Sequence, residues 1–215
     1  GACWTNFILF SAMVLFHPKL KGYRIYQDWV SPKWQYIREQ LQIGLPIGSS
    51  IFFEASIFSI AGLLMVHFGS AVVAAHQSVI AFTNVFYCLP LSIAMASTIA
   101  VGYEVGAKRH KEAIQYSYIS RVLAIVIAIL ICAFTFTHME SISALFTNDE
   151  EVYNLIYRFL GYGVFFSAFD AIGTPLQGIL RGYKDVKIVF YISLVSYWGV
   201  CFPIAYILAN NPNYG

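Results

Sequence analysis

The chain has 215 residues, of which 59% are hydrophobic and only 11% are charged. A soluble domain of this size normally carries roughly a quarter charged residues, and a disordered chain would combine few apolar residues with a large net charge. The 13 basic and 11 acidic residues leave a net charge of +2, too small for a nucleic-acid-binding surface. This composition predicts an integral membrane protein.

Five apolar stretches are long enough to cross the roughly 30 Å hydrocarbon layer of a bilayer. They cover residues 43–66, 78–102, 118–138, 155–180 and 188–208. Residues 1–16 are apolar too but too short to span, because a membrane helix needs about 20 residues. We expect residues 1–16 to be the end of a helix in a longer protein. The predicted fold class is all-α, a bundle of membrane-spanning helices.

The basic residues predict how the bundle is oriented. Twelve of the 13 basic residues lie in or beside alternate connections between the spans, and Arg158 is the exception. They are Lys19, Lys21, Arg24, Lys33 and Arg38 in the first connection, Lys108, Arg109, Lys111 and Arg121 around the third, and Arg181, Lys184 and Lys187 in the fifth. Cytoplasmic connections of membrane proteins are enriched in Lys and Arg. We therefore expect these three connections to be cytoplasmic.

Two carboxylates, Glu54 and Asp170, fall inside predicted spans, whereas the other nine acids lie in connections or at span ends. An ionisable group at mid-bilayer costs at least about 2.5–3.5 kcal/mol on the insertion scale, so it persists mainly where it has a function. At about 1.5 Å per residue, Glu54 lies about 16 Å and Asp170 about 15 Å from the cytoplasmic ends of their spans. The two acids are therefore expected at nearly equal depth, where one cavity can reach both.

The side chains near these acids indicate what they bind. Ser167, Thr174 and Gln177 share a helix face with Asp170, and Pro175 frees the Ala171 carbonyl beside it. Carboxylate, hydroxyl and carbonyl oxygens suit Na+ or a proton relay. Neighbouring aromatic rings suit an organic cation. We thus expect Glu54 and Asp170 to be a cation-binding or coupling site, which takes either Na+, the candidate metal ion, or protons. Candidate secondary contacts for cation or substrate are Ser50, Phe53, Phe166, Ser167, Ala171, Thr174 and Gln177.

No other motif indicates a cofactor or an enzyme. The four cysteines occur singly in apolar stretches, without the spacing of metal ligands. All five histidines fall at span ends or in connections. An intramembrane acyltransferase or protease would need a base beside its acid or serine, and no histidine lies at the depth of Glu54 or Asp170. We therefore expect no catalytic residues and no cofactor other than a coupling ion.

Five short motifs resemble, in order and spacing, the second half of multidrug and toxic compound extrusion (MATE) transporters, and the NorM-type bacterial branch in particular. They are Leu45-Pro-Ile-Gly with Phe-Phe-Glu54, Ala75-His-Gln77, Leu89-Pro-Leu-Ser92, Val101-Gly with Gly106, and Leu180-Arg-Gly-Tyr-Lys-Asp185. In that family twelve helices form two six-helix lobes, and cations are exchanged for drugs. The resemblance implies that residues 1–16 end helix 6, residues 17–42 form the cytoplasmic connection between lobes, and residues 43–215 hold helices 7–11 of the carboxy-terminal lobe, without helix 12.

By position, Glu54 matches the family's acidic residue on helix 7, and Asp170 matches its acid on helix 10. Both belong to the family's cation-binding region. Phe166 stands one turn before Asp170, where some relatives have a tyrosine hydroxyl near the cation. The resemblance therefore leaves both Na+ and H+ open as the coupling ion.

The resulting functional hypothesis is secondary active multidrug efflux by antiport of Na+ or H+. The exported compounds would be small cationic aromatic drugs or dyes, and the protein would be a multi-pass protein of the bacterial inner (plasma) membrane. Its partners would be the lipid bilayer and the amino-terminal lobe of the same protein, and not nucleic acid. Two alternatives are a flippase of related fold for lipid-linked precursors, which would need cationic side chains around its cavity, and a non-transport membrane scaffold.

Overall fold

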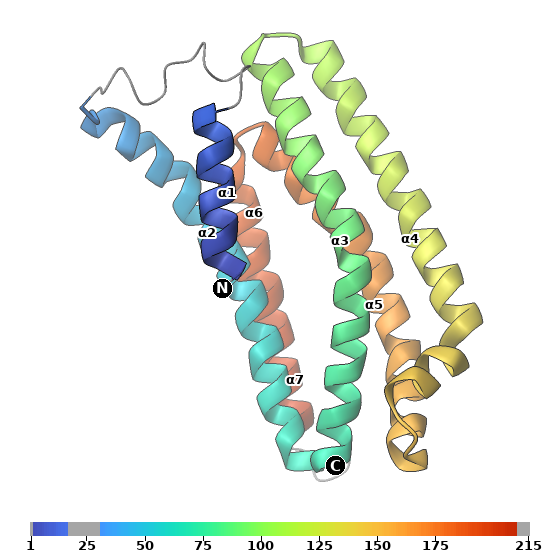
Figure 1. The fold of residues 1–215 in the computed structure, drawn as a ribbon. Coiled ribbons are helices and arrows are strands. Elements are labelled where there is room, and N and C mark those ends of the chain that lie inside the picture. Colours follow the sequence, from blue (N-terminus) through green and yellow to red (C-terminus); the bar gives the residue numbers. More distant parts are fainter. Residues whose placement is uncertain (1, 17–30, 210–215) are drawn as a thin grey trace. The chain divides into compact units, whose positions relative to one another are not determined.

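The computed structural model describes residues 2–16 and 31–209, which are almost entirely helical (Figure 1). The predicted cytoplasmic residues Lys19, Lys21 and Arg24, and residues 210–215, lie outside the described part of the chain. The chain divides into two units, residues 1–42 and 43–215. In the first unit, α1 (Ala2–Phe16) is a helix with no buried residue.

Five long helices in the described part are apolar enough to cross a membrane, which confirms the predicted all-α membrane fold. They are α2 (Trp34–Met65, continued by one 3-10 turn at Val66–Phe68), α3 (Ser70–Gly106), α4 (His110–Phe146), α5 (Glu150–Gly182), and a last helix made of α6 (Val186–Ser193), the π-helical segment η3 (Leu194–Cys201) and α7 (Phe202–Ala209). Each predicted apolar stretch lies within one of these helices.

Most helices extend beyond the stretch that hydropathy predicts. α2 begins at Trp34 rather than at residue 43, α3 begins at Ser70 rather than at residue 78, and α4 ends at Phe146 rather than at residue 138. The length of an apolar stretch matches the thickness of the hydrocarbon layer, whereas backbone hydrogen bonding continues the helix into the polar interface. Residues 34–42, predicted to belong to a connection, are therefore helical.

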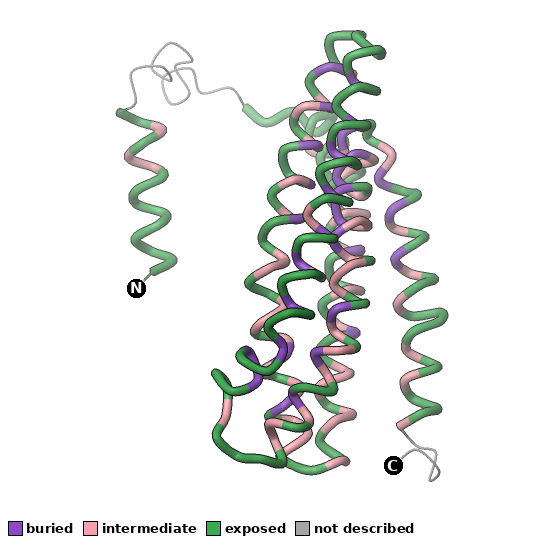
Figure 2. Tube along the Cα trace, turned by 90° about the vertical axis from the view of Figure 1, so that its right-hand side faces the viewer, coloured by how far each residue is buried: buried purple, intermediate pink, exposed green. Residues whose placement is uncertain are grey.

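Helices α3, α4 and α5 pack closely, and most buried positions of the second unit lie on them (Figure 2). Many of these positions hold small residues: Ala75, Ala94, Ser97, Ala113, Ser117, Ser120, Ala124, Ala128, Ser143, Ala171, Gly178 and Gly182. Without a hydrophobic driving force between helices in lipid, small residues give close backbone contact and hydroxyls bond across the interface. The Ser97 and Ser120 hydroxyls meet at 2.8 Å, and the Thr98 hydroxyl donates to the Gly178 carbonyl oxygen at 2.8 Å.

The closest approach of α3 and α5 is at Gly178. A Cβ atom there would lie 2.7 Å from the Cα atom of Ala94 and closer still to its carbonyl oxygen. One turn later, a Cβ atom on Gly182 would lie 2.9 Å from Cβ of Val101. The absence of a side chain at Gly178 and Gly182 therefore fixes the spacing between α3 and α5. These two helices carry most of the candidate site.

Helix breaks do not simply follow the prolines. α3 and α5 continue as α-helices through the buried residues Pro90 and Pro175. α4 has no proline but is interrupted at His138, whose φ and ψ are −118° and 15°. The His138 ring nitrogen Nδ1 lies 3.0 Å from the Phe134 carbonyl oxygen. In the last helix, π-helical turns directly precede Pro203, a residue that cannot donate a backbone hydrogen bond.

The turns α3–α4 and α5–α6 have the same backbone geometry. Lys108 and Lys184 adopt φ values of 60° and 61°, and each turn is closed by a bond from the next residue's N–H to a carbonyl five residues earlier. The buried Glu104 carboxylate also accepts a bond from Nε of Arg109 at 2.6 Å. These contacts hold the predicted cytoplasmic ends of the two helix pairs in fixed turns.

The α3–α5 spacing can be tested by substitution of Gly178. In the purified full-length protein, Gly178→Ala should lower the melting temperature, because the new methyl group overlaps the Ala94 backbone and overpacking costs about 1–3 kcal/mol. Helix propensity alone would favour alanine by about 1 kcal/mol, so the predicted sign is opposite to that of propensity.

Gly102→Ala is the matched control, because a Cβ atom there would meet Gly182 at an ordinary 3.6 Å. Equal melting temperatures for the two variants would contradict the close contact.

Candidate functional site

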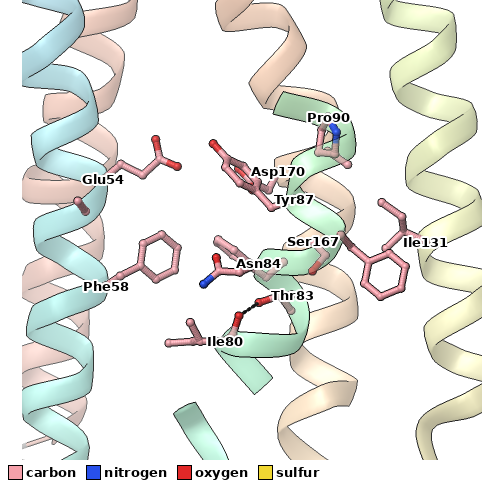
Figure 3. Close-up of a pocket in the computed structure, with 14 residues that line it drawn as sticks. Glu54, Phe58, Ile80, Thr83, Asn84, Tyr87, Pro90, Ile131, Ser167 and Asp170 are labelled. Atoms are coloured by element: carbon pink, nitrogen blue, oxygen red, sulfur yellow. Dashed lines mark hydrogen bonds between the residues drawn. The ribbon is translucent and has the colours of Figure 1, made fainter. Parts of the chain in front are cut away.

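A cavity of about 300 Å3 opens between α2 on one side and α3 and α5 on the other (Figure 3). Its wall consists of Glu54, Ala55 and Phe58 from α2, Ile80, Thr83, Asn84, Phe86, Tyr87 and Pro90 from α3, Ile131 from α4, and Phe166, Ser167, Asp170 and Ala171 from α5. The volume is at the lower end of the range of small-molecule sites. All of the wall residues belong to the second unit.

The structure brings Glu54 and Asp170 to this one cavity. α2 and α5 run antiparallel, so residues at similar distances from the predicted cytoplasmic ends meet at the same height. The Thr174 hydroxyl, one turn after Asp170 on α5, donates to Oδ1 of Asp170 at 3.3 Å. Two carboxylates thus approach the cavity from different helices, while no Lys, Arg or His is among the described residues of its wall.

Several neutral oxygen atoms accompany the carboxylates. Ser167 of α5 and the α3 residues Thr83, Asn84 and Tyr87 line the cavity, and Figure 3 shows Tyr87 and Asn84 on the side that faces α2. Thr83 donates its hydroxyl to the Ile80 carbonyl at 3.1 Å, which leaves its oxygen free to accept. Such oxygens are the ligands that hard cations prefer.

The two prolines in the helices add carbonyl oxygens. A proline removes the hydrogen-bond donor to the carbonyl four residues earlier. For Pro90 this carbonyl belongs to Phe86 and for Pro175 to Ala171, and both residues line the cavity. The Ala171 carbonyl, which the sequence predicts to be freed by Pro175, therefore has a counterpart in the Phe86 carbonyl of α3.

The predicted secondary contacts divide into two groups. Phe166, Ser167 and Ala171 line the cavity, whereas Ser50, Phe53, Thr174 and Gln177 lie outside its wall. Ser50 is buried and donates to the Pro46 carbonyl at 2.8 Å, while Gln177 accepts from Arg181 at 3.4 Å.

Phe53 lies among rings of the last helix instead. Its ring centroid is 5.7 Å from that of Phe190 and 6.5 Å from that of Trp198, whose Nε1 donates to the Ser56 hydroxyl at 3.3 Å. Adjacent residues on a helix point about 100° apart, so Phe53 points away from the cavity that its neighbour Glu54 lines.

The predicted site residues do not include three wall residues on α3: Thr83, Asn84 and Tyr87. An amide and two hydroxyl side chains within two turns of a proline, inside a membrane span, are a signal that could have identified them. They matter because Phe166 offers no hydroxyl at the position where the family resemblance implies one. In the structure Tyr87 brings a hydroxyl into the same cavity from another helix.

The rest of the wall is apolar and largely aromatic. Phe58 and Phe166 meet edge to face, with ring centroids 5.6 Å apart and an interplanar angle of 83°. Within the described residues, no cluster of three or more His, Cys, Asp and Glu side chains is placed to hold a metal ion. The arrangement suits a hard monovalent cation or protons at the carboxylates, and an apolar ring system against the wall.

Comparison with known proteins relates the chain to one family. A family model named MatE matches residues 46–207. The chain is 44% identical over 88% of its length to a probable multidrug resistance protein NorM of Oceanobacillus iheyensis. It is 45% identical over 89% of its length to the protein of the same description in Geobacillus kaustophilus, and 44% identical over 96% to that of Halalkalibacterium halodurans. It spans about 42% of the length of each relative.

The hydrogen bond to Asp170 yields a test of cation binding. Thr174→Val keeps the side-chain shape but removes the donor that orients the carboxylate, a loss worth about 0.5–1.5 kcal/mol. The Na+ concentration that half-maximally raises the melting temperature of the full-length protein should increase by about two- to tenfold.

The control is Thr137→Val, because the exposed Thr137 hydroxyl bonds only within its own helix and to His138. If Thr174→Val and the wild type respond alike to Na+ and to pH, Asp170 is not a cation ligand that Thr174 positions.

Proposed function

The chain belongs to the MatE family, whose members are transporters, and from this premise we propose that it forms the carboxy-terminal half of a secondary active multidrug efflux protein. The compounds exported would be cationic and aromatic, and Na+ or H+ would enter in exchange. The five spanning helices and the bacterial relatives make it a multi-pass protein of the bacterial plasma membrane.

The observation that supports this proposal most is the pair of carboxylates at one cavity without a cationic side chain in its wall. Two negative charges in a mostly apolar enclosure are costly, so the site favours any bound positive charge. A sodium ion can satisfy the carboxylates together with the neutral oxygens of Asn84, Tyr87 and Ser167. Protons can instead neutralise Glu54 and Asp170 directly.

Exchange follows from competition for this charge. When Na+ or H+ from outside occupies Glu54 and Asp170, the cavity no longer attracts an organic cation, which is released. When the inorganic cation leaves toward the cytoplasm, the charge is restored and a new drug binds. The coupling needs only that each ligand changes the affinity for the other, or that the two favour different conformations.

The apolar wall supplies the second element of drug recognition. Phe58, Phe86 and Phe166 surround the charged pair with flat, polarisable surfaces. A cationic group near a carboxylate and a ring against these side chains gain both electrostatic and hydrophobic stabilisation. This combination tolerates many ligand shapes, as multidrug recognition requires.

The alternatives fit the cavity less well. A flippase for lipid-linked precursors would need Lys or Arg against the pyrophosphate, and the wall has two acids instead. A scaffold would pair its buried acids, whereas both acids here face a cavity. Ser167 lies near Asp170, but the wall has no histidine to act as a base, so we expect no catalytic activity.

Substitution of the two acids tests the function. In cells that produce the full-length protein, Asp170→Asn and Glu54→Gln should each reduce ethidium efflux nearly to the level of cells without it. Each amide keeps the size of its side chain and removes the charge that both ligands share. The measurement is ethidium fluorescence under an imposed Na+ gradient and, separately, an imposed proton gradient.

Glu140→Gln serves as the control, because Glu140 is an exposed acid of α4 that does not line the cavity. Efflux driven by only one of the gradients identifies the coupling ion. Normal efflux by both variants, at wild-type protein levels, would contradict the proposal.

A further inference from the structure

A second cavity adjoins the first. Its volume is about 340 Å3, and it shares four wall residues with the carboxylate cavity: Phe58, Ile80, Thr83 and Phe166. The rest of its wall consists of Met65, His76, Val79, Phe159, Tyr162 and Gly163. None of these residues belongs to the wall of the first cavity, so the two spaces meet only at the four shared residues.

The second cavity is displaced in the same direction along three helices. On α2 its wall extends to Met65, on α3 to His76, and on α5 to Phe159, whereas the carboxylate cavity reaches Glu54, Pro90 and Asp170. All three displacements lead toward the α2–α3 and α4–α5 turns. These turns lie opposite the basic connections, so the charge pattern places the second cavity on the outer side.

The boundary between the two cavities is formed mainly by one aromatic pair. Phe58 of α2 and Phe166 of α5 line both spaces, with ring centroids 5.6 Å apart. Figure 3 shows Phe58, Ile80 and Thr83 together at one end of the carboxylate cavity, beyond Glu54 and Tyr87. The two rings come from different helices, α2 and α5.

The second cavity differs from the first in its chemistry. Its described wall contains no Asp or Glu and is formed largely by aromatic, aliphatic and thioether side chains. His76 is its one ionisable group besides the phenol of Tyr162, and Nδ1 of His76 has no hydrogen-bond partner. Such a wall cannot hold a bare inorganic cation, but it suits an uncharged, flat ring system.

Resting on the proposed function, we propose that the second cavity is the ring subsite of the drug site. A multi-ring cation places its charged group at Glu54 and Asp170, passes the Phe58–Phe166 pair, and buries its rings among Met65, Phe159 and Tyr162. The pair then contacts the ligand between its charged and apolar parts. Affinity for large aromatic cations depends on this second space, whereas the coupling ion uses only the first.

The test fills the second cavity and leaves the first intact. Met65→Trp adds bulk at a residue that lines only the second cavity, and Leu63→Trp is the matched control on the same helix, because Leu63 is 68% exposed. In the purified full-length protein, the ethidium Kd from fluorescence anisotropy should rise about tenfold or more in Met65→Trp. It should stay within about twofold of wild type in Leu63→Trp.

Two further variants make the result decisive. Phe159→Leu keeps an apolar side chain but removes a ring that lines only the second cavity, and should raise the Kd about two- to tenfold. It decides the question if Met65→Trp fails to fold, as judged by its melting temperature. Asp170→Asn reports on the proposed function, since it removes charge from the first cavity alone.

The outcomes separate the two proposals. A higher Kd in Asp170→Asn with wild-type affinity in Met65→Trp and Phe159→Leu would overturn the ring subsite and leave the transport function standing. Wild-type affinity in all of these variants would contradict both. An equal loss in Met65→Trp and Leu63→Trp would also overturn the subsite, because a tryptophan anywhere on α2 would then have the same effect.

Discussion

The cost of two carboxylates inside a membrane governs this structure. Glu54 and Asp170 lie on different spanning helices and face the same cavity. Charge at that depth must be solvated, paired or neutralised, and the cavity wall offers neutral oxygens but no positive side chain. A bound cation or proton is therefore the natural partner of the pair. Exchange between two cations is possible because the site depends on a positive charge that a bound ligand supplies.

The packing divides the second unit into a close core and a more loosely attached wall. α3, α4 and α5 meet through small residues, and Gly178 lies against the backbone of Ala94. α2 buries only Ser50 and Ile57 and reaches its neighbours mainly through rings. The close contacts between α3 and α5 thus keep their part of the site in register.

The sequence predicted the spans and the common depth of the acids, because hydropathy and a rise of about 1.5 Å per residue suffice for both. It missed the ends of the helices, which hydrogen bonding sets. It also missed Asn84 and Tyr87, since the neighbour of α2 is decided by packing between distant segments. For Phe53, helix geometry alone separates it from Glu54 by about 100°, whereas its contact with Trp198 depends on where the last helix packs. The roles of the acids and the choice of coupling ion stay predictions.

In the proposed exchange, drug and coupling ion use the same negative charge. The most direct measurement is the ethidium Kd of the purified full-length protein at increasing Na+ concentration and, separately, at decreasing pH. Competition for this charge should make the apparent Kd rise in proportion to the concentration of one of the two cations, once that concentration exceeds the cation's own Kd. A constant Kd across both titrations would contradict it, because Glu54 and Asp170 would then bind the drug without regard to the ion.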